Sequence, residues 1–399
     1  MIRAERNGVA AEVKKIYAEQ GGVAAAVVKV YAEKNGVAEL VFPVGNIKKV
    51  LSKSTATADN LSLARCYIGT GCTANHAFFV GGADSSNHGC KNVDAYDING
   101  VMTAAADSSL AQARATCVQN GNSTNPILLV AHGPSTGSSA SGYSFVYCYS
   151  DDLTRSGASD LYTAVMQPAV FYLNEKSIIA GGRNGSTYYG YCNCYTKNNI
   201  VTLLNNLGKD RAYSGGAATD DFGAIVGGYN GSRLTDIDYY NKSDVHSVGR
   251  LSIGRQYPMT ARLGDGIVVA GGNIDPGGST SGIASVNATD SIEYIGKDKV
   301  ISTIGTLHHA VSIGNCAGND EIVAFFDGAD GSTGSNVRTK DVEYMNSDMV
   351  ATLTDPTTDE HFLGGAARLG KKVFIGGGSA TGGTRVSSVE IYGIKEEQS

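Results

Sequence analysis

Aromatic, amide and guanidinium side chains gather in several segments that are rich in Gly, Ser and Asn, and this combination suits recognition of a sugar. An aromatic ring offers an apolar platform for one face of a sugar, while amide and guanidinium groups hydrogen-bond to its hydroxyls. Any one of these residues could instead serve only its turn, since Asn and Gly readily adopt positive φ. As a set they predict a ligand-binding surface made by Asn87, His88, Tyr143, Arg183, Asn184, Tyr188, Tyr189, Tyr229, Asn230 and Arg233.

The sequence offers little that would support catalysis or cofactor binding. A copper oxidase site needs His and Tyr ligands, and His308 and His309 are the only adjacent histidines. Neighbours on a strand point to opposite faces, so we expect one imidazole to be buried and the other exposed. Cys192 and Cys194 are a close pair, but two further ligands at the spacing of a zinc site are missing. We therefore predict no catalytic residue, no metal and no cofactor.

A short apolar run that ends in two glycines recurs along the chain. Seven copies lie between Gly81 and Gly376, if weaker ones ending at Gly133 and Gly328 are included, which gives about 49 residues per repeat. Inner strands of neighbouring sheets crowd toward a shared axis, so a side chain at the pair would clash, and glycine also frees φ. The five clear pairs are Gly81–Gly82, Gly181–Gly182, Gly227–Gly228, Gly271–Gly272 and Gly376–Gly377.

The residues after each glycine pair complete the pattern of a four-stranded sheet. A third strand carries a tyrosine whose ring we expect in the core, with its hydroxyl bonded between sheets. These tyrosines are Tyr96, Tyr149, Tyr195, Tyr240, Tyr294, Tyr344 and Tyr392. A fourth strand then ends near a basic or polar residue, among them Arg65, Arg114, Arg211, Arg255, His309 and His361.

The glycine pairs and the tyrosines resemble kelch repeats. Kelch repeats typically pair the tyrosine with a tryptophan, and this chain has none, so the resemblance is to a divergent kelch family. It implies an all-β, seven-bladed kelch-like β-propeller over residues 46–399, with the loops between second and third strands on the same face as the loops between blades. Because residues 47–54 match the fourth-strand pattern, we expect them to complete the seventh blade and close the ring, which removes an exposed edge.

Residues 1–45 carry a shorter repeat, with Gly8, Gly22 and Gly36 spaced 14 residues apart. Asn-Gly and Gly-Gly punctuate stretches rich in Val, Ile and Tyr, which predicts short linked strands joined by hairpins. These units resemble the N-terminal segments of phage and prophage tail proteins of Gram-positive hosts. The resemblance implies docking to a tail or baseplate protein, whereas a β extension that packs only on itself, or on other copies of the chain, remains the alternative. The predicted attachment residues are Val13, Ile16, Tyr17, Val27, Val30 and Tyr31.

Composition narrows the choice of partners. The net charge is −6 and forms no basic stripe, which argues against nucleic acid, and no run of 18 apolar residues predicts a membrane span. An apolar leader is absent, so we expect synthesis in the bacterial cytoplasm and a place in a virion or tail-like particle. The predicted function is a receptor-binding or adhesin component that recognises a bacterial surface glycan or protein. The alternatives are an enzyme that modifies cell-wall glycan and an intracellular kelch scaffold.

Overall fold

A computed structural model of the chain describes residues 3–6, 9–12, 16–18, 29–34, 37–43, 47–122, 125–138, 141–274, 287–326, 328–330 and 338–398. This part of the chain consists of strands and turns without a helix. Accordingly, none of the described residues belongs to a helix that could cross a membrane. The chain divides into two compact units, Met1–Val50 with Lys395–Ser399, and Leu51–Ile394.

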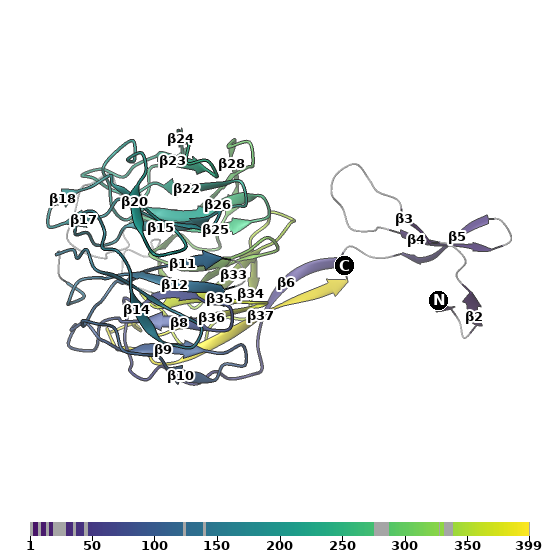
Figure 1. Cartoon of the computed structure of the whole chain (residues 1–399). Coiled ribbons are helices and arrows are strands. Elements are labelled where there is room, and N and C mark those ends of the chain that lie inside the picture. The colour runs from purple at the N-terminus through teal and green to yellow at the C-terminus, as the bar shows by residue number, and fades with distance from the viewer. Residues whose placement is uncertain are drawn as a thin grey trace. The chain divides into compact units, whose positions relative to one another are not determined.

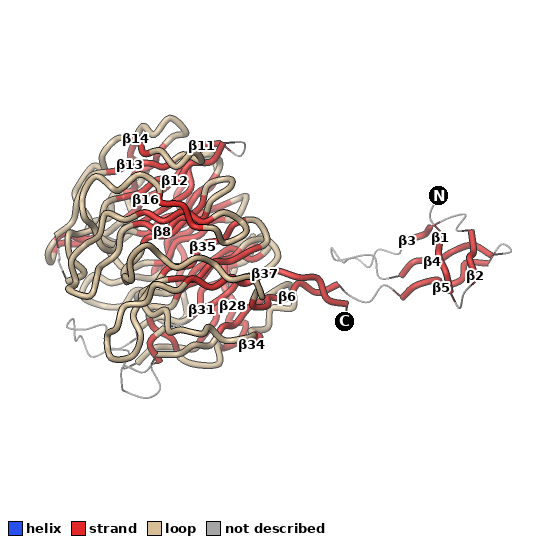
Figure 2. The backbone as a smooth tube through the Cα atoms, turned by 90° about the horizontal axis from the view of Figure 1, so that it is seen from below, coloured by secondary structure: helices blue, strands red, loops and turns tan. Residues whose placement is uncertain are grey.

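Among the described residues, seven four-stranded antiparallel sheets form a seven-bladed β-propeller, as the repeat predicts (Figures 1 and 2). The first four blades are β7 (Gly69–Cys72), β8 (Ala77–Val80), β9 (Val93–Tyr96) and β10 (Met102–Ala104); β11 (Thr116–Asn122), β12 (Asn125–Ala131), β13 (Val146–Tyr149) and β14 (Arg155–Gly157); β15 (Ala169–Leu173), β16 (Lys176–Ala180), β19 (Cys192–Tyr195) and β20 (Val201–Leu203); and β21 (Gly215–Ala218), β22 (Phe222–Val226), β23 (Asp236–Asn241) and β24 (His246–Arg250). The others are β25 (Met259–Leu263), β26 (Gly266–Ala270), β27 (Ser291–Ile295) and β28 (Ile301–Thr306); β30 (Asn315–Gly318), β31 (Val323–Phe326), β33 (Val342–Met345) and β34 (Thr352–Thr354); and β35 (Gly365–Leu369), β36 (Lys372–Gly376), β37 (Val389–Gln398) and β6 (Ile47–Lys53).

The apolar runs form the second strands of the blades because both of their faces are covered. Every residue of β8, β22 and β26 is buried, whereas all three residues of the outer strand β14 are exposed. Neighbouring blades share one core: Phe78 and Val80 of the first blade pack in a cluster with Leu128, Val130 and Tyr149 of the second. The continuous apolar pattern therefore reports burial between two sheets rather than burial on one side.

The ring is closed by β6, which pairs with β37 as the outer strand of the seventh blade. The backbone N–H of Ser54 donates to the Ile391 carbonyl at 2.8 Å, and the Lys53 ammonium pairs with the Glu390 carboxylate. On the side of the sixth blade, the Thr354 hydroxyl donates to the Leu51 carbonyl at 2.8 Å. A strand from early in the chain thus joins the last two blades, which confirms the predicted closure by residues 47–54.

The glycine pairs lie at the junctions between blades. Gly181 and Gly182 have φ values of +70° and +103°, and a Cβ on Gly181 would lie 2.5 Å from the Arg211 carbonyl oxygen of the next blade. In the seventh blade the left-handed pair is Gly377–Gly378, one residue later than predicted, because Gly376 still belongs to β36. The N–H of the second glycine donates to a backbone carbonyl oxygen of the next blade at 2.7–2.9 Å. The pairs are Gly82–Gln112, Gly182–Arg211, Gly228–Arg255, Gly272–Val311 and Gly378–Arg65.

A buried ion pair holds the segment that enters each of several blades, which we call the entry loop. Its basic side chain, an arginine in three blades and a histidine in one, lies against a carboxylate on the third strand. The N–O distances are 2.9, 2.7, 2.6 and 3.1 Å in Arg65–Asp94, Arg211–Asp238, Arg255–Glu293 and His361–Glu390. Gln112 replaces the cation in the second blade and Val311 in the sixth, so Arg114 and His309 do not occupy the position that the sequence pattern suggested. The basic residue is therefore structural in four blades.

Six of the seven third-strand tyrosines are buried, as predicted, but Tyr294 is only partly buried, because the neighbouring Ile295 takes the core position at the end of β27. In four blades the tyrosine hydroxyl bonds to the entry loop. It donates to a carbonyl oxygen at 2.7–2.9 Å in the pairs Tyr149–Ala106, Tyr195–Ser159, Tyr240–Asn205 and Tyr392–Asp355. Each bond joins a third strand to the segment that follows the previous blade. The expected role between blades is thus confirmed for these four tyrosines.

The N-terminal unit contains β1 (Arg3–Arg6) paired with β2 (Val9–Glu12), and a three-stranded sheet of β3 (Ile16–Ala18), β4 (Lys29–Lys34) and β5 (Val37–Pro43). The pairs Arg6↔Val9 and Lys34↔Val37 leave two residues between partners, Asn7-Gly8 and Asn35-Gly36, which is the hairpin length that the sequence predicts. Of the predicted attachment residues, Ile16, Tyr17, Val30 and Tyr31 lie on β3 and β4, where Tyr17 is the Cα partner of Tyr31. Val13 and Val27 lie outside the described residues.

Candidate functional site

The entry loops and the loops between second and third strands lie on one face of the propeller, which we call the loop face. In an antiparallel four-stranded sheet the hairpins joining strands one to two and three to four occupy the other end. Pairing across the loop face supports this placement: Met166 of an entry loop pairs with Arg183, and Ala212 pairs with Tyr229. The second-to-third-strand loops therefore rest on the entry loops.

Each entry loop contributes one residue in the left-handed region, with φ between +53° and +62°, and together these residues form a ring around the propeller axis. Backbone hydrogen bonds connect them. The N–H of Arg114 donates to the Tyr67 carbonyl oxygen at 2.7 Å, and the N–H of Tyr67 donates to the Leu363 carbonyl oxygen at 2.6 Å. The N–H of Tyr257 likewise donates to Tyr213 at 2.8 Å. The ring is Tyr67, Arg114, Gln167, Tyr213, Tyr257, Ile313 and Leu363.

These seven residues line a cavity of about 270 Å³ on the axis, with every blade contributing to its wall. Aromatic and cationic groups dominate one part of the wall. The Arg114 guanidinium lies 4.4 Å from the centre of the Tyr67 ring, and the rings of Tyr213 and Tyr257 have centroids 4.7 Å apart. Arg114 is the one charged residue of the lining, and no carboxylate from the described part of the chain reaches it.

Four of the predicted binding residues gather beside this cavity. The Arg183 guanidinium lies 5.3 Å from the centre of the Tyr213 ring, and the Arg233 guanidinium lies 5.3 Å from the Tyr229 ring. Tyr188 and Tyr213 flank Tyr229 with centroid distances of 5.9 and 6.5 Å. The hairpin of β17 (Arg183–Asn184) and β18 (Thr187–Tyr188) carries two members of this group. The result is a cluster of tyrosine rings and guanidinium groups around Tyr229, which is itself only 7 % exposed, and we call this cluster the aromatic patch.

The other predicted residues serve the loops in different ways. The Asn184 side chain accepts the N–H of Gly142 at 3.1 Å. Tyr143 packs on His132 with a centroid distance of 4.9 Å, Tyr189 stacks on Tyr191 at 6.1 Å, and Asn230 is exposed. The backbone carbonyl of Asn87 accepts the N–H of Gly137 at 3.1 Å, and His88 pairs with Thr136 through an isolated antiparallel β-bridge of the backbone. Asn184, Tyr143 and Tyr189 thus contact neighbouring loops through their side chains, whereas Asn87 and His88 do so through the backbone, and no ring contact of the described residues joins any of them to the aromatic patch.

The electrostatics of the patch favour neutral tyrosines beside positive charge. Burial raises the pKa of Tyr213, although the nearby Arg183 opposes this shift, and burial also raises the pKa of Tyr188 and Tyr257. All three rings consequently keep their phenolic hydrogens at neutral pH. They can donate hydrogen bonds to a ligand while the guanidinium groups attract negative charge.

Sequence reasoning missed the residues that line the axis. Tyr67, Tyr213 and Tyr257 each follow an entry cation by two positions, as Arg65-Cys66-Tyr67, Arg211-Ala212-Tyr213 and Arg255-Gln256-Tyr257. This Arg-x-Tyr spacing recurs in three repeats and could have drawn attention to them. Their convergence was hidden because the three tripeptides lie far apart in the chain and meet only when the ring closes.

Comparison with known proteins adds no family to this architecture. No protein-family model matches the sequence, and no curated protein matches it. The seven-bladed β-propeller is therefore established by the pairing of the strands themselves.

Proposed function

We propose that the loop face binds a bacterial cell-surface glycan and that residues 1–45 dock the chain to a phage-type tail or baseplate, so that the protein acts as a receptor-binding or adhesin component. The observation that carries the proposal is the axial cavity together with the aromatic patch beside it, where tyrosine rings and guanidinium groups meet on the loop face. A sugar requires both kinds of group, because its ring face is apolar and its edge is polar.

The composition of the cavity supports a short, acidic piece of glycan. Its volume of about 270 Å³ is close to the lower end of small-ligand pockets, which begin near 300 Å³. Ser214 and Asn315 line it beside Tyr213 and Tyr257, which adds hydrogen-bonding groups to the rings. Arg114 favours a sugar that carries a carboxylate or a phosphate.

The tail assignment and the kelch assignment are parts of the same proposal. The glycine pairs and third-strand tyrosines support a kelch-type propeller, and the paired short strands of residues 1–45 support a separate attachment segment. A virion or tail-like particle would carry several copies, and this multivalency would raise a weak affinity for each glycan site. Synthesis in the bacterial cytoplasm and release in the particle fit this role.

Binding of the full chain to an array of bacterial surface glycans tests the ligand. Tyr213→Ala and Arg114→Ala should each weaken binding at least about tenfold, since each removes a ring platform or a charged hydrogen bond. The matched controls are Tyr172→Ala and Arg262→Ala, which change residues of the β15–β16 and β25–β26 hairpins on the opposite face. Equal losses in all four variants, or a ligand that proves to be a surface protein, would contradict the glycan proposal. Release of soluble sugar when the chain is incubated with purified cell wall would instead support the alternative of an enzyme that modifies cell-wall glycan.

Docking is tested separately with tail particles purified from the host after the gene for this chain has been deleted. The full chain should co-sediment with particles that lack it, and a chain without residues 1–45 should not, while its glycan binding stays unchanged. The deletion retains Ile47–Lys53, so the seventh blade remains complete. Equal recovery of both chains would exclude the attachment segment and favour a scaffold that acts elsewhere.

A further inference from the structure

The sixth blade lacks the permanent positive charges that its counterpart, the fourth blade, carries. In the fourth blade Lys209 pairs with Asp236 at 3.0 Å and Arg211 pairs with Asp238 at 2.7 Å. The sixth blade keeps both carboxylates, as Asp341 and Glu343, but places His309 and Val311 at the two cation positions. Two acidic side chains are thus left with imidazole as their counterpart.

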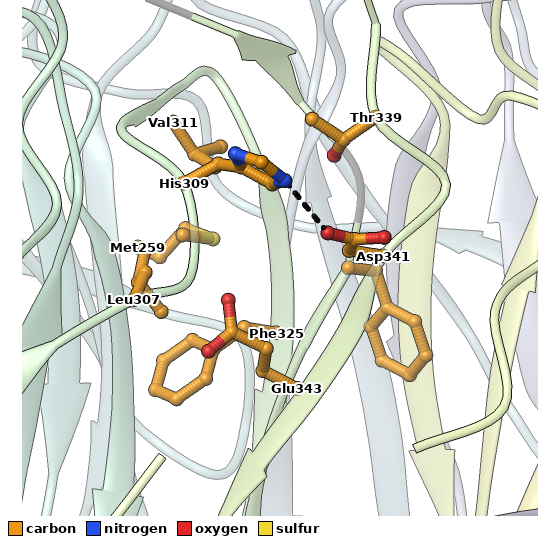
Figure 3. Close-up of a pocket in the computed structure, with 9 residues that line it drawn as sticks. Met259, Leu307, His309, Val311, Phe325, Thr339, Asp341 and Glu343 are labelled. Atoms are coloured by element: carbon orange, nitrogen blue, oxygen red, sulfur yellow. Dashed lines mark ion pairs between the residues drawn. The ribbon is translucent and has the colours of Figure 1, made fainter. Parts of the chain in front are cut away.

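Two histidines converge on this acidic pair. The Nε2 atom of His309 lies 3.1 Å from a carboxylate oxygen of Asp341, as the dashed line in Figure 3 shows. The rings of His308 and His309 have centroids 4.5 Å apart. They lie in the bend after β28 and not on a strand, so the expected alternation does not apply and neither ring is buried. One ligand atom from each of His308, His309 and Asp341 lies within 4.8 Å of the others.

Glu343 fixes the backbone of this cluster from below. Its side chain is only 6 % exposed, and its two carboxylate oxygens accept the backbone N–H of His308 at 2.9 and 3.0 Å. A cavity of about 10 Å³, lined by His309, Asp341 and Glu343, separates these side chains (Figure 3). The bend that presents both imidazoles is therefore held by a buried carboxylate.

We propose that His308, His309 and Asp341 bind a divalent transition-metal ion, with Zn²⁺ the best match. Two imidazole nitrogens and a carboxylate oxygen are typical zinc ligands at about 2.0–2.2 Å, and a tetrahedral site with such bonds has edges of about 3.3 Å. The 3.1 Å separation between His309 Nε2 and the Asp341 carboxylate oxygen is close to such an edge, and a ring nitrogen of His308 lies within 4.8 Å of both ligand atoms. The exposure of His308 leaves the fourth position open to water. A metal here supplies the positive charge that Lys209 and Arg211 supply in the fourth blade.

Titration of the untagged full chain with ZnCl₂, followed by isothermal calorimetry, tests the site. We expect one high-affinity ion per chain, and at least a tenfold weaker affinity in both His309→Ala and Asp341→Asn. His76→Ala is the matched control, because His76 also faces a carboxylate, Asp151 at 3.3 Å, but has no second histidine beside it. This control should bind Zn²⁺ like the unmodified chain.

A second readout keeps the result independent of folding. Replacement of Zn²⁺ by Co²⁺ should give the intense visible absorption of a four-coordinate site, and His308→Ala should abolish it while the far-ultraviolet circular dichroism stays unchanged. Absence of a stoichiometric site, or binding that His309→Ala and Asp341→Asn leave intact, would overturn the proposal. Because the cluster is separate from the axial cavity, glycan binding can fail without affecting this outcome.

Discussion

The backbone N–H of Gly182 donates to the carbonyl oxygen of Arg211 at 2.8 Å, which joins the end of one blade to the loop that enters the next. The Arg211 side chain is buried and pairs with Asp238 of its own blade at 2.7 Å. One residue thus ties three segments together: its carbonyl holds the previous blade and its guanidinium holds the third strand. Equivalent contacts recur at Arg65 and Arg255. The stability of the ring therefore depends on junctions that are repeated along the chain.

Substitution at a junction glycine should destabilise the propeller. In Gly182→Ala the new Cβ would lie 2.8 Å from Val165 in a backbone with φ of +103°, so we expect a loss of at least about 2 kcal/mol in the free energy of unfolding. Gly157→Ala is the control, because nothing lies within 4 Å of its Cβ position and it should change stability by less than about 0.5 kcal/mol. Chemical denaturation measures both. Equal losses of stability in the two variants would mean that the close packing at the glycine junction does not contribute to the free energy of unfolding.

Breaking one buried ion pair should cost more than removing it whole. Arg255 and Glu293 are fully buried with an N–O distance of 2.6 Å. Arg255→Met leaves an uncompensated carboxylate and should destabilise by about 3–5 kcal/mol. In the double variant Arg255→Met/Glu293→Leu part of that loss should return, and a double-mutant cycle in urea would measure the coupling. Strictly additive losses would show that the two side chains act independently.

The tyrosine hydroxyls provide a finer test of contacts between blades. Tyr195→Phe removes the bond to the Ser159 carbonyl at 2.7 Å and should cost about 1 kcal/mol. The hydroxyl of Tyr96 is buried without a hydrogen-bond partner among the described residues, so Tyr96→Phe should be neutral or slightly stabilising. Thermal unfolding of the two variants distinguishes them. The prediction is wrong if Tyr96→Phe costs as much as Tyr195→Phe.

Closure of the ring should weaken in acid. Burial opposes ionisation of Glu390, but hydrogen bonds from His361 and Lys53 lower its pKa to about 2. Because this value lies below the pKa of about 4.3 in an unfolded chain, the stabilisation is complete above pH 4.3 and is lost as the pH falls toward 2. Its size is up to about 3 kcal/mol. The stability difference between the unmodified chain and Glu390→Gln should therefore narrow between pH 5 and pH 2, measured by urea unfolding.

Glu396→Gln is the control for this pH dependence. Glu396 pairs with Lys49 at 2.6 Å but is 53 % exposed, and a pair this exposed contributes at most about 1 kcal/mol. A small difference from the unmodified chain is expected at every pH. A pH dependence as steep as that of Glu390→Gln would assign the acid sensitivity to surface charge and not to the closing strand.

Local patterns predicted the sheets because each blade is a local unit. The apolar run and the third-strand tyrosine recur at a fixed spacing, and antiparallel neighbours follow each other directly in the chain. The glycine pair of the seventh blade was placed one residue early because Gly376, Gly377 and Gly378 are identical in type, and only the register of β36 distinguishes them. Arg114 was grouped with the basic residues of the entry loops because it is also an arginine near the end of its repeat. In the structure it lies two residues later than the position of Arg65, at the position of Tyr67, which shares its left-handed φ.

By itself the sequence determined the class of fold, the number of blades and the strand that seals the ring, because these follow from periodicity and from the edge that an open ring would expose. Tertiary structure alone decided which side chains meet. Tyr67, Tyr213 and Tyr257 face one cavity, and His308, His309 and Asp341 approach one another, only after strands distant in the chain have been arranged about a common axis. A repeat specifies each blade from within, whereas convergence on the axis depends on the packing of all seven.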